Sequence, residues 1–434
     1  MSSPDRSPAS TPGSTPASPP ASTGTQAGRA TDIAAPAASP AQQFWYLSGI
    51  GSWFAAFGIQ AVTFPWITAF LLNESPLRIG MAQASLWLPL LLFLLVGGAV
   101  ADRYDLRRIM IVLHAAALVP PAVVALLEGA GVLTFWPIIA YGLTMGTIMA
   151  FLQPARDGLL ARIAGGRIQR MVLMTIALQY GPQLCGTLAA GLTGLVGLIP
   201  VLGIQVAILA FGVLSAVMLH PAPPEPGQRE APLRAIGNGL RLVAGHATIR
   251  TVVAMGAFVG FFYVGGFLAI LPVLVRDAYG SAEQFAAFYA VWATGSVIMM
   301  AAIIRFGPLS HPGRALLLSI LGSSGCMLIA SFAPPTAWMF ALMLVWGGIA
   351  GISASMSRTV VQQLAPPRER ARVLATFQLG FMGSVPVGAF LGGWLTDLAG
   401  PGHAMWAAPI AVLPLALWVL AGRRVWAYRP DPEK

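Results

Sequence analysis

Charged side chains are scarce in this chain. Asp, Glu, Lys and Arg make up 9% of its 434 residues, whereas a soluble domain carries about 25% charged residues. Only two cysteines are present, Cys185 and Cys326, and both lie in apolar stretches. This distribution argues against a disulfide framework and against a cysteine-based metal site. We therefore expect neither a bound metal ion nor an organic cofactor.

Long apolar runs are what the chain has in abundance. Hydrophobic residues make up 56% of the sequence, and a helix needs about 20 mostly apolar residues to cross the hydrocarbon layer of a membrane. The runs are continuously apolar rather than alternating, which argues against membrane-spanning strands. Twelve spans are predicted, at approximately 45–72, 79–101, 109–127, 133–153, 171–192, 196–219, 251–275, 285–304, 315–332, 337–357, 374–396 and 404–421.

Lysine and arginine are unevenly distributed between the loops. If the amino terminus is cytoplasmic, all but two of the 25 basic residues fall in the tails or in cytoplasmic loops, and the exceptions are Arg78 and Arg276. Basic loops remain in the cytoplasm, so both termini are predicted to be cytoplasmic. The protein itself is predicted to span the plasma membrane, which in a bacterium is the inner membrane. Because the arginines are dispersed among lipid-length spans, we exclude nucleic-acid binding. The net charge of +10 suits an anionic leaflet instead.

The spans and the polar stretches divide the chain into five regions. The first is rich in Ser, Thr, Pro, Ala and Gly and has no apolar segment long enough to pack, which is typical of disorder. In the middle, prolines precede apolar and basic residues at helical spacing, which predicts a short surface helix. We expect a disordered cytoplasmic tail at 1–43, a six-helix bundle at 44–219, a cytoplasmic linker with an amphipathic helix at 220–250, a second six-helix bundle at 251–422 and a cytoplasmic tail at 423–434.

The two halves of the chain share a spacing of landmarks. The pattern Arg-x13-Arg-x10-Gly-x4-Gly-x4-Gly begins at Arg156 and again at Arg358, which is 202 residues later, and the same offset pairs Gly58 with Gly260. This register relates the fourth and fifth spans to the tenth and eleventh. It predicts two six-helix halves that repeat one arrangement.

The loop between the second and third spans carries the most informative motif. Gly98, Asp102, Arg103 and Arg107 occupy the places of Gly-x-x-x-Asp-Arg-x-Gly-Arg-Arg/Lys, the pattern of the loop between helices 2 and 3 in the major facilitator superfamily. The chain resembles that superfamily. The resemblance implies an all-α membrane protein, with twelve transmembrane helices in two six-helix bundles related by a pseudo-twofold axis, that works as a secondary transporter.

The resemblance also assigns a gate to this loop. Asp102 ends a span, where its carboxylate can accept charge-assisted hydrogen bonds, and Asp157 closes the fourth span at the same face as a partner for Arg103 or Arg107. The alternative is that these charges only cap helices and keep loops in the cytoplasm. Two positions depart from the pattern, because Asp105 replaces its glycine and Leu106 its first basic residue. The predicted gating residues are Gly98, Asp102, Arg103, Arg107, Arg156, Asp157 and Arg358.

Two further groups of residues bear on transport. Gly181, Pro182 and Gly186 in the fifth span resemble a helix-5 motif of exporting members, in which small residues and proline serve close packing and kinking. The resemblance places a cavity among spans 1, 4, 7 and 10. Its aromatic walls suit an amphipathic substrate, although packing against another helix is the ordinary role of each side chain. The candidate cavity residues are Trp53, Gln60, Trp66, Tyr141, Thr144, Phe262, Tyr263 and Trp346.

No carboxylate is predicted in the middle of a span. Acids within the membrane are the usual marks of proton relays, so an obvious relay is missing from the 15 acids of this chain. The remaining candidates for proton binding are side chains near span ends and one histidine within the third span. They are Asp102, Asp157, Asp397, Glu74 and His114.

These patterns indicate a carrier that exports a small amphipathic organic molecule, such as a drug or siderophore, in exchange for protons. We expect a monomer whose partners are membrane lipids, a small-molecule substrate and protons. Uptake of a metabolite by the same fold is one alternative, and a non-transporting membrane scaffold or receptor is another. An enzyme is disfavoured, because no nucleophile–base pair or metal-ligand cluster can be drawn within the spans.

Overall fold

A computed structural model of the protein describes residues 39–434, except 165–167, 225–236, 238–240, 308, 310, 365–369, 423–424 and 427–434. Most of the predicted N-terminal tail, linker helix and C-terminal tail therefore lies outside the described residues. The first helix begins at Pro40, four residues before the predicted start of the first bundle at residue 44.

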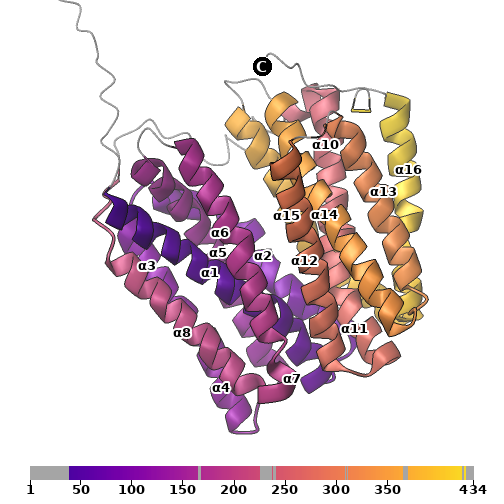
Figure 1. The fold of residues 1–434 in the computed structure, drawn as a ribbon, viewed down its shortest axis with the longest axis horizontal. Coiled ribbons are helices and arrows are strands. Elements are labelled where there is room, and N and C mark those ends of the chain that lie inside the picture. The colour runs from indigo at the N-terminus through magenta and orange to yellow at the C-terminus, as the bar shows by residue number, and fades with distance from the viewer. Residues whose placement is uncertain are drawn as a thin grey trace, which may run out of the picture. The chain divides into compact units, whose positions relative to one another are not determined.

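Helices account for nearly all of the described chain (Figure 1). The first half contains α1 (Pro40–Trp66), the π-helical η1 (Ile67–Leu71), α2 (Pro76–Ala101), α3 (Leu106–Ala117), α4 (Val119–Gly129), α5 (Phe135–Ala164), α6 (Ile168–Ala190), α7 (Thr193–Val196) and α8 (Leu198–Val217). The second half contains α10 (Ala247–Phe258), the π-helical η3 (Val259–Gly266), α11 (Phe267–Tyr279), α12 (Ala282–Phe306), α13 (Pro312–Ala330), α14 (Thr336–Leu364), α15 (Arg370–Ala404) and α16 (Ala407–Gly422).

The described helices provide twelve membrane crossings. Ten helical runs are long and apolar enough to span a membrane, and α6 with 23 residues and α16 with 16 residues supply the other two. The predicted all-α membrane fold is confirmed, and the described residues include no strand. The third crossing consists of α3 and α4, which meet at Leu118. A new helix starts there with Pro120 and Pro121 in its first turn, the part of a helix in which proline costs least.

Local sequence signals set the starts of several helices. Ser39 caps α1 by accepting a hydrogen bond from the Gln42 amide at 3.4 Å, and Ser75 caps α2 by accepting one from the Arg78 amide at 3.4 Å. A proline occupies the first turn of each of these two helices. Such caps satisfy amides that have no partner within the helix.

Buried side chains form two main clusters that correspond to the two halves. One cluster draws mostly on residues between Tyr46 and Ala222, and the other mostly on residues between Val243 and Val425. A third, small cluster of Ala69, Ile79 and Val273 joins side chains from both halves. The halves are therefore two helical bundles with separate cores, as Figure 1 shows by the indigo-to-magenta and salmon-to-yellow ribbons.

The sequence repeat corresponds to a repeated packing contact. Gly58 and Gly186 bring α1 and α6 together, and Gly260 and Gly388, each 202 residues later, bring η3 and α15 together. At all four positions a Cβ atom would overlap a main-chain carbonyl oxygen of the neighbouring helix. Only glycine permits this approach. Corresponding pairs of helices therefore cross tightly in the two bundles.

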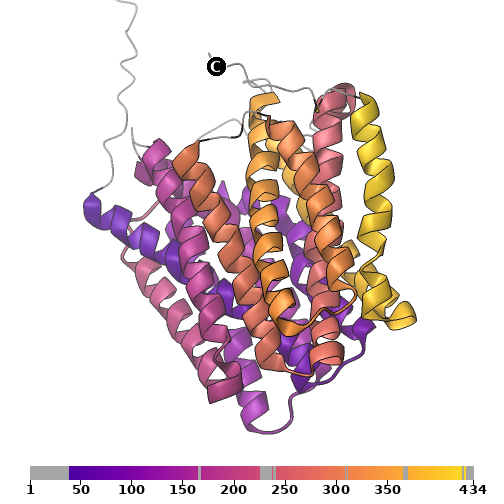
Figure 2. The same cartoon turned by 45° about the vertical axis from the view of Figure 1, so that its right-hand side comes forward.

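The two bundles contact each other near one end of the helices, which we call the Arg276 end. There Gly80 of α2 lies against Gly393 of α15, and the rings of Phe70 and Phe285 lie 5.8 Å apart. The other end carries the loop of Asp102, and we call it the Asp102 end. The helices of the two halves draw apart toward it in Figure 1, and Figure 2 shows the same helices after a turn of 45°.

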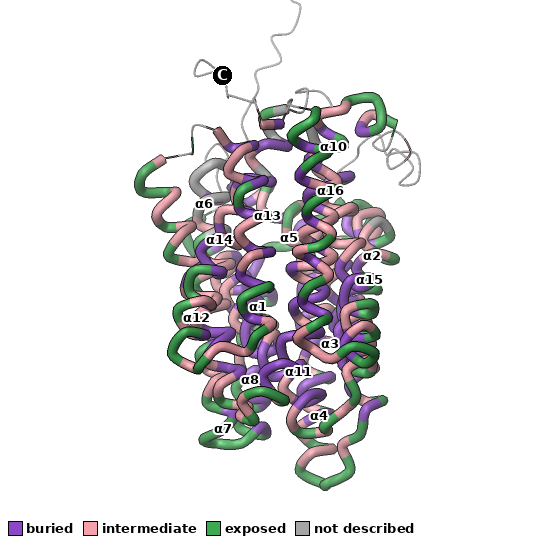
Figure 3. The backbone as a smooth tube through the Cα atoms, turned by 90° about the vertical axis from the view of Figure 1, so that its right-hand side faces the viewer, coloured by how far each residue is buried: buried purple, intermediate pink, exposed green. Residues whose placement is uncertain are grey.

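Large apolar side chains cover much of the outer surface. Examples are Leu126, Phe306 and Leu417, which are 74%, 84% and 69% exposed. In Figure 3 exposed residues, drawn in green, occur along outer helices such as α12 and α16. Water does not tolerate apolar surface of this extent on a monomer, whereas lipid does. The outer surface therefore suits the membrane interior.

Candidate functional site

The loop between α2 and α3 is exposed at the Asp102 end. Asp102 is the C-cap residue of α2, and Asp102, Arg103 and Tyr104 are all exposed. A Cβ atom at Gly98 would meet nothing within 4 Å, whereas Gly97 lies directly against the Ala150 carbonyl of α5. In this arrangement Gly97, and not the Gly98 of the motif, holds α2 close to α5.

The two residues that depart from the superfamily pattern bind the start of the linker, which we define as residues 217–223. One carboxylate oxygen of Asp105 accepts from the Arg108 amide at 3.0 Å and so caps α3, while the other accepts from the Ala222 amide at 2.8 Å. The Leu106 amide donates to the Ala222 carbonyl at 3.0 Å, and the Leu106 side chain is buried. The carboxylate of Asp105 thus stabilises a helix start and the linker.

Three more side chains bind the same segment. Arg107 donates to the Val217 carbonyl at 2.6 Å, and Arg162 donates to the Pro223 carbonyl at 2.5 Å. The side-chain amide of Gln42 donates to the Met218 carbonyl at 3.0 Å and accepts from the His220 amide at 2.7 Å. Together with Asp105 these residues form what we call the linker clamp. Arg107, predicted as a gating residue, contributes to this clamp here.

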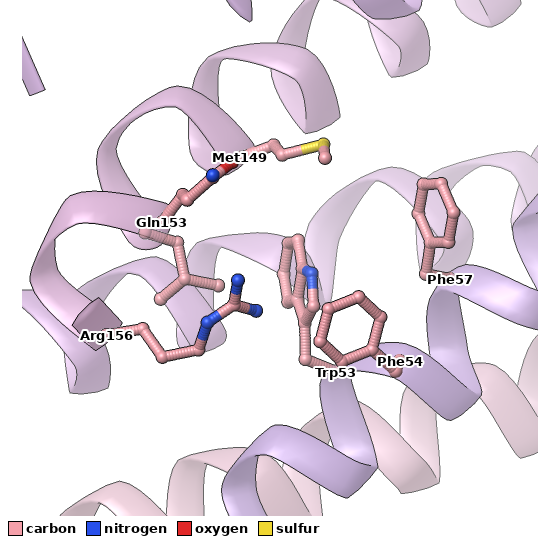
Figure 4. A pocket seen from close by; sticks show the side chains of 7 residues that line it. Trp53, Phe54, Phe57, Met149, Gln153 and Arg156 are labelled. Atoms are coloured by element: carbon pink, nitrogen blue, oxygen red, sulfur yellow. The ribbon is translucent and has the colours of Figure 1, made fainter. Parts of the chain in front are cut away.

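Arg156 of α5 points into the first bundle. Its carbonyl accepts a hydrogen bond from the Tyr46 hydroxyl at 3.1 Å, and its guanidinium carbon lies 4.9 Å from the centre of the Phe54 ring. The side chain lines a small pocket between α1 and α5 (Figure 4). The other lining residues are Trp53, Phe54, Phe57, Met149, Leu152 and Gln153. The neighbouring Asp157 is exposed, and its pairing with Arg103 or Arg107 stays a prediction. The side chain of Arg358 lies outside the described residues.

The candidate cavity residues of the first bundle lie in different surroundings. Trp53 lines the pocket of Arg156. Tyr141 is buried, and its hydroxyl accepts from the Gln205 side-chain amide at 3.1 Å. Gln60 is buried and its side-chain oxygen has no partner in the described part of the chain. Trp66 is half-buried and Thr144 is exposed.

Those of the second bundle lie mostly among other side chains. The Tyr263 hydroxyl is hydrogen-bonded to the Ile320 carbonyl and to the Ser324 hydroxyl, both at 2.6 Å. Trp346 is buried with its ring 4.9 Å from that of Phe267. Phe262 is half-buried and packs on Phe258 and Phe261, with ring centres 4.6 and 4.7 Å apart. The structure therefore does not gather the candidate residues of the two bundles around one described cavity.

The three residues of the helix-5 motif have different roles in packing. Gly186 lies directly against the Ala55 carbonyl, and the Pro182 ring would be 3.7 Å from a Cβ atom at Gly51. A Cβ atom at Gly181 would meet nothing within 4 Å. The contact between α1 and α6 therefore depends on Gly186 and involves Pro182, but not Gly181.

The structure gives a role to one of the two arginines that broke the charge pattern. Arg276 of α11 donates to the Glu74 carbonyl at 2.9 Å and to the Ala69 carbonyl at 3.4 Å, so it joins the second bundle to the first. It also pairs with Asp277 at 3.0 Å. Arg78 pairs with the Glu74 carboxylate at 2.9 Å. No sequence motif marks Arg276, although its position as an exception to the charge distribution is a usable signal.

His114 of α3 is the predicted proton-binding candidate that is not a carboxylate. Its side chain is buried, Nδ1 lies 2.9 Å from the Met110 carbonyl, and its ring packs edge-on at 5.8 Å against Trp53. Nε2 has no hydrogen-bond partner among the described residues. Within the same residues no three His, Cys, Asp or Glu side chains lie close enough together to hold a metal ion.

Comparison with known proteins identifies the family. Residues 35–426 match the transmembrane secretion effector family of the major facilitator superfamily. The chain belongs to this family. Among characterised relatives it is similar to the enterobactin exporter EntS of Escherichia coli, with 24% identity over 386 residues, which cover 84% of this chain and 87% of the exporter.

Solved structures show the same fold. The nucleoside transporter NupG aligns with a TM-score of 0.69 and 14% identity over 90% of this chain and 99% of its own. A bacterial homologue of the human lysosomal transporter Spinster aligns with a TM-score of 0.66 and 15% identity over 91% of this chain and 100% of its own. These two structures show the fold. Membership of the secretion effector family, together with similarity to a characterised exporter, makes the chain a multi-pass membrane transporter and not an enzyme.

Proposed function

We propose that this transporter exports a small amphipathic organic molecule across the bacterial inner membrane, by alternating access and in exchange for protons. The observation that carries the proposal is the difference between the two ends of the bundles. Arg276 and the contact of Gly80 with Gly393 join the bundles at one end, while the loop of Asp102 is exposed at the other. A carrier needs such a closure at each end in turn.

The basic loops support the orientation. They lie at the Asp102 end, and basic loops face the cytoplasm, so both termini are cytoplasmic. The structure then corresponds to a carrier that receives its substrate from the cytoplasm, which is the first step of export. Similarity to a protein named as an enterobactin exporter favours the same direction and an aromatic, siderophore-like or drug-like substrate.

In the opposite state the two closures exchange. Arg276 releases the carbonyls of Glu74 and Ala69, and the loop of Asp102 closes against the second bundle. Asp102 then accepts charge-assisted hydrogen bonds, with Arg103, Asp157 and Arg358 as further members of that gate. The candidate sites for the coupled proton are Asp102, Asp157, Asp397, Glu74 and His114, because the described spans hold no acid at mid-depth.

The test compares the accumulation of a panel of labelled aromatic compounds in cells with and without the gene. Export predicts lower accumulation in energised cells that carry the gene, and collapse of the pH gradient should remove the difference. Higher energised accumulation would instead establish uptake. If no compound moves, a scaffold or receptor explains the fold, and flux that survives loss of the pH gradient rules out proton exchange.

A further inference from the structure

The pocket between α1 and α5 has two faces of different chemistry. On α5 the residues 149, 152, 153 and 156 follow the spacing of one helix face, and they end on a guanidinium. On α1 the aromatic rings of Trp53, Phe54 and Phe57 line the opposite wall. The cavity volume is about 20 Å³, close to what one water molecule needs. The pocket can therefore hold a small functional group of a ligand, but not a whole ligand.

The direction of the Arg156 side chain is unusual. Long basic side chains near the end of a span normally extend outward to the membrane surface. The main chain of Arg156 lies at the level of Tyr46, yet its guanidinium stacks on Phe54. Phe54 is eight residues further along α1, which is about 12 Å deeper. Arg156 thus directs its guanidinium toward the aromatic side chains of α1.

No acidic side chain of the described residues pairs with this guanidinium. Its contacts are the Phe54 ring and the pocket wall, and its Nε is buried without a hydrogen-bond partner in the described part of the chain. Stacking on a ring compensates only part of the cost of removing a cation from water. The geometry therefore leaves donor groups and a positive charge available to a ligand. Figure 4 shows the guanidinium reaching toward Trp53 and Phe54, with Met149 and Phe57 around the same space.

We propose that this pocket binds the carboxylate of an aromatic organic acid, and that such acids are the substrate class of the transporter. The inference rests on the proposed function. The guanidinium fork matches a carboxylate, and the side-chain amide of Gln153 lies one turn away on the same face. Only the carboxylate enters the pocket, and the aromatic ring attached to it lies outside, against the half-buried Phe57, since aromatic side chains favour edge and offset contacts with rings.

The test measures binding to the purified full chain in lipid nanodiscs by calorimetry. The probes are 2-naphthoate and its neutral analogue 2-naphthamide, which share a ring system and differ in charge. The wild-type protein should bind the naphthoate at least about tenfold more tightly than the amide, the factor given by one charge-assisted hydrogen-bonded contact. Arg156→Gln should remove this preference and leave amide binding unchanged. Arg108→Gln, at an exposed arginine of α3, should retain it.

A conservative variant separates a binding role from a structural one. Arg156→Lys keeps the charge but loses the planar fork, so it should weaken naphthoate binding severalfold while the protein still elutes as one folded species. It carries the test if Arg156→Gln does not fold. Equal affinity of the wild type for both probes would overturn the inference, and so would an unchanged preference in the Arg156 variants.

The binding and transport results can fail separately. If the wild type prefers naphthoate but moves no compound into proteoliposomes, the carboxylate site stands, whereas the proposed function and the assignment of these acids as substrates fail. If the protein moves aromatic compounds with the same selectivity for anions after Arg156→Gln, the proposed function stands and the inference fails.

Discussion

Replacing Asp105 with alanine should release the start of the linker from the first bundle. The carboxylate of Asp105 caps α3 at the Arg108 amide and accepts from the Ala222 amide at 2.8 Å. Loss of a helix cap costs about 0.5–2 kcal/mol, and we take the lower end, about 0.5 kcal/mol. Loss of a hydrogen bond to a charged group costs about 1.5–3 kcal/mol, and we take the lower part of that range because Asp105 is half-exposed. The expected local destabilisation is therefore about 2 kcal/mol.

Hydrogen exchange at the clamped amides measures this change directly. A loss of about 2 kcal/mol raises the local opening equilibrium about 30-fold, so the amides of Ala222 and Leu106 should exchange faster by that factor. Asp105→Asn should have a smaller effect, because asparagine caps a helix as well as aspartate does. Glu128→Ala, which changes an acid at the other end of the bundle, serves as the control.

Unchanged exchange at Ala222 and Leu106 in the alanine variant would refute the clamp. So would an equal increase in the Glu128 control, since that would reflect general loosening of the bundle. The prediction is independent of the substrate, because exchange needs only the purified protein.

Three further predictions concern gating and packing. Arg276→Gln should weaken the closure of its end by about 1–2 kcal/mol, since it loses bonds to two carbonyls, and spin labels on α2 and α15 should report longer distances there. Gly186→Leu should cost at least about 1–3 kcal/mol through overpacking against the Ala55 carbonyl and lower the melting temperature in detergent. Gly181 faces open space, so Gly181→Leu should leave the melting temperature unchanged. Asp102→Asn should reduce efflux without reducing the amount of protein in the membrane.

Each of these has a clear contrary result. Unaltered label distances would remove Arg276 from the closure. Equal melting temperatures for the two glycine variants would show that α1 and α6 are not held by the contact at Gly186. Normal efflux by Asp102→Asn would remove that carboxylate from the mechanism.

The crossings were predictable from the sequence because they depend on apolar length alone. The predicted spans near 196–219 and 404–421 match α8 and α16 to within three residues. The start of α1 at Pro40 was missed, although Ser39 followed by proline is a helix-start signal. The predicted start depends on apolar residues, and the first residues of α1 are mostly not apolar.

The arrangement of the site was less predictable, because it depends on contacts between distant residues. In the sequence Asp105 only replaces the glycine of the superfamily pattern, and its contact with Ala222, 117 residues away, shows its role in the clamp. Arg156 has the same local sequence signals as any basic residue at a span end. Its inward direction depends on the position of Phe54 on another helix, which no local pattern encodes.

The chemical nature of the two acceptors of Arg276 determines how the sequence at this contact can vary during evolution. Both are main-chain oxygens, of Ala69 and Glu74, so side-chain replacement at either position leaves the acceptor in place. No carbonyl titrates in the physiological range, so the acceptors of these two bonds do not change with pH. Relatives are free to vary residues 69 and 74 without a matching change at 276. Analysis of covarying positions would therefore overlook the contact that joins the bundles at this end.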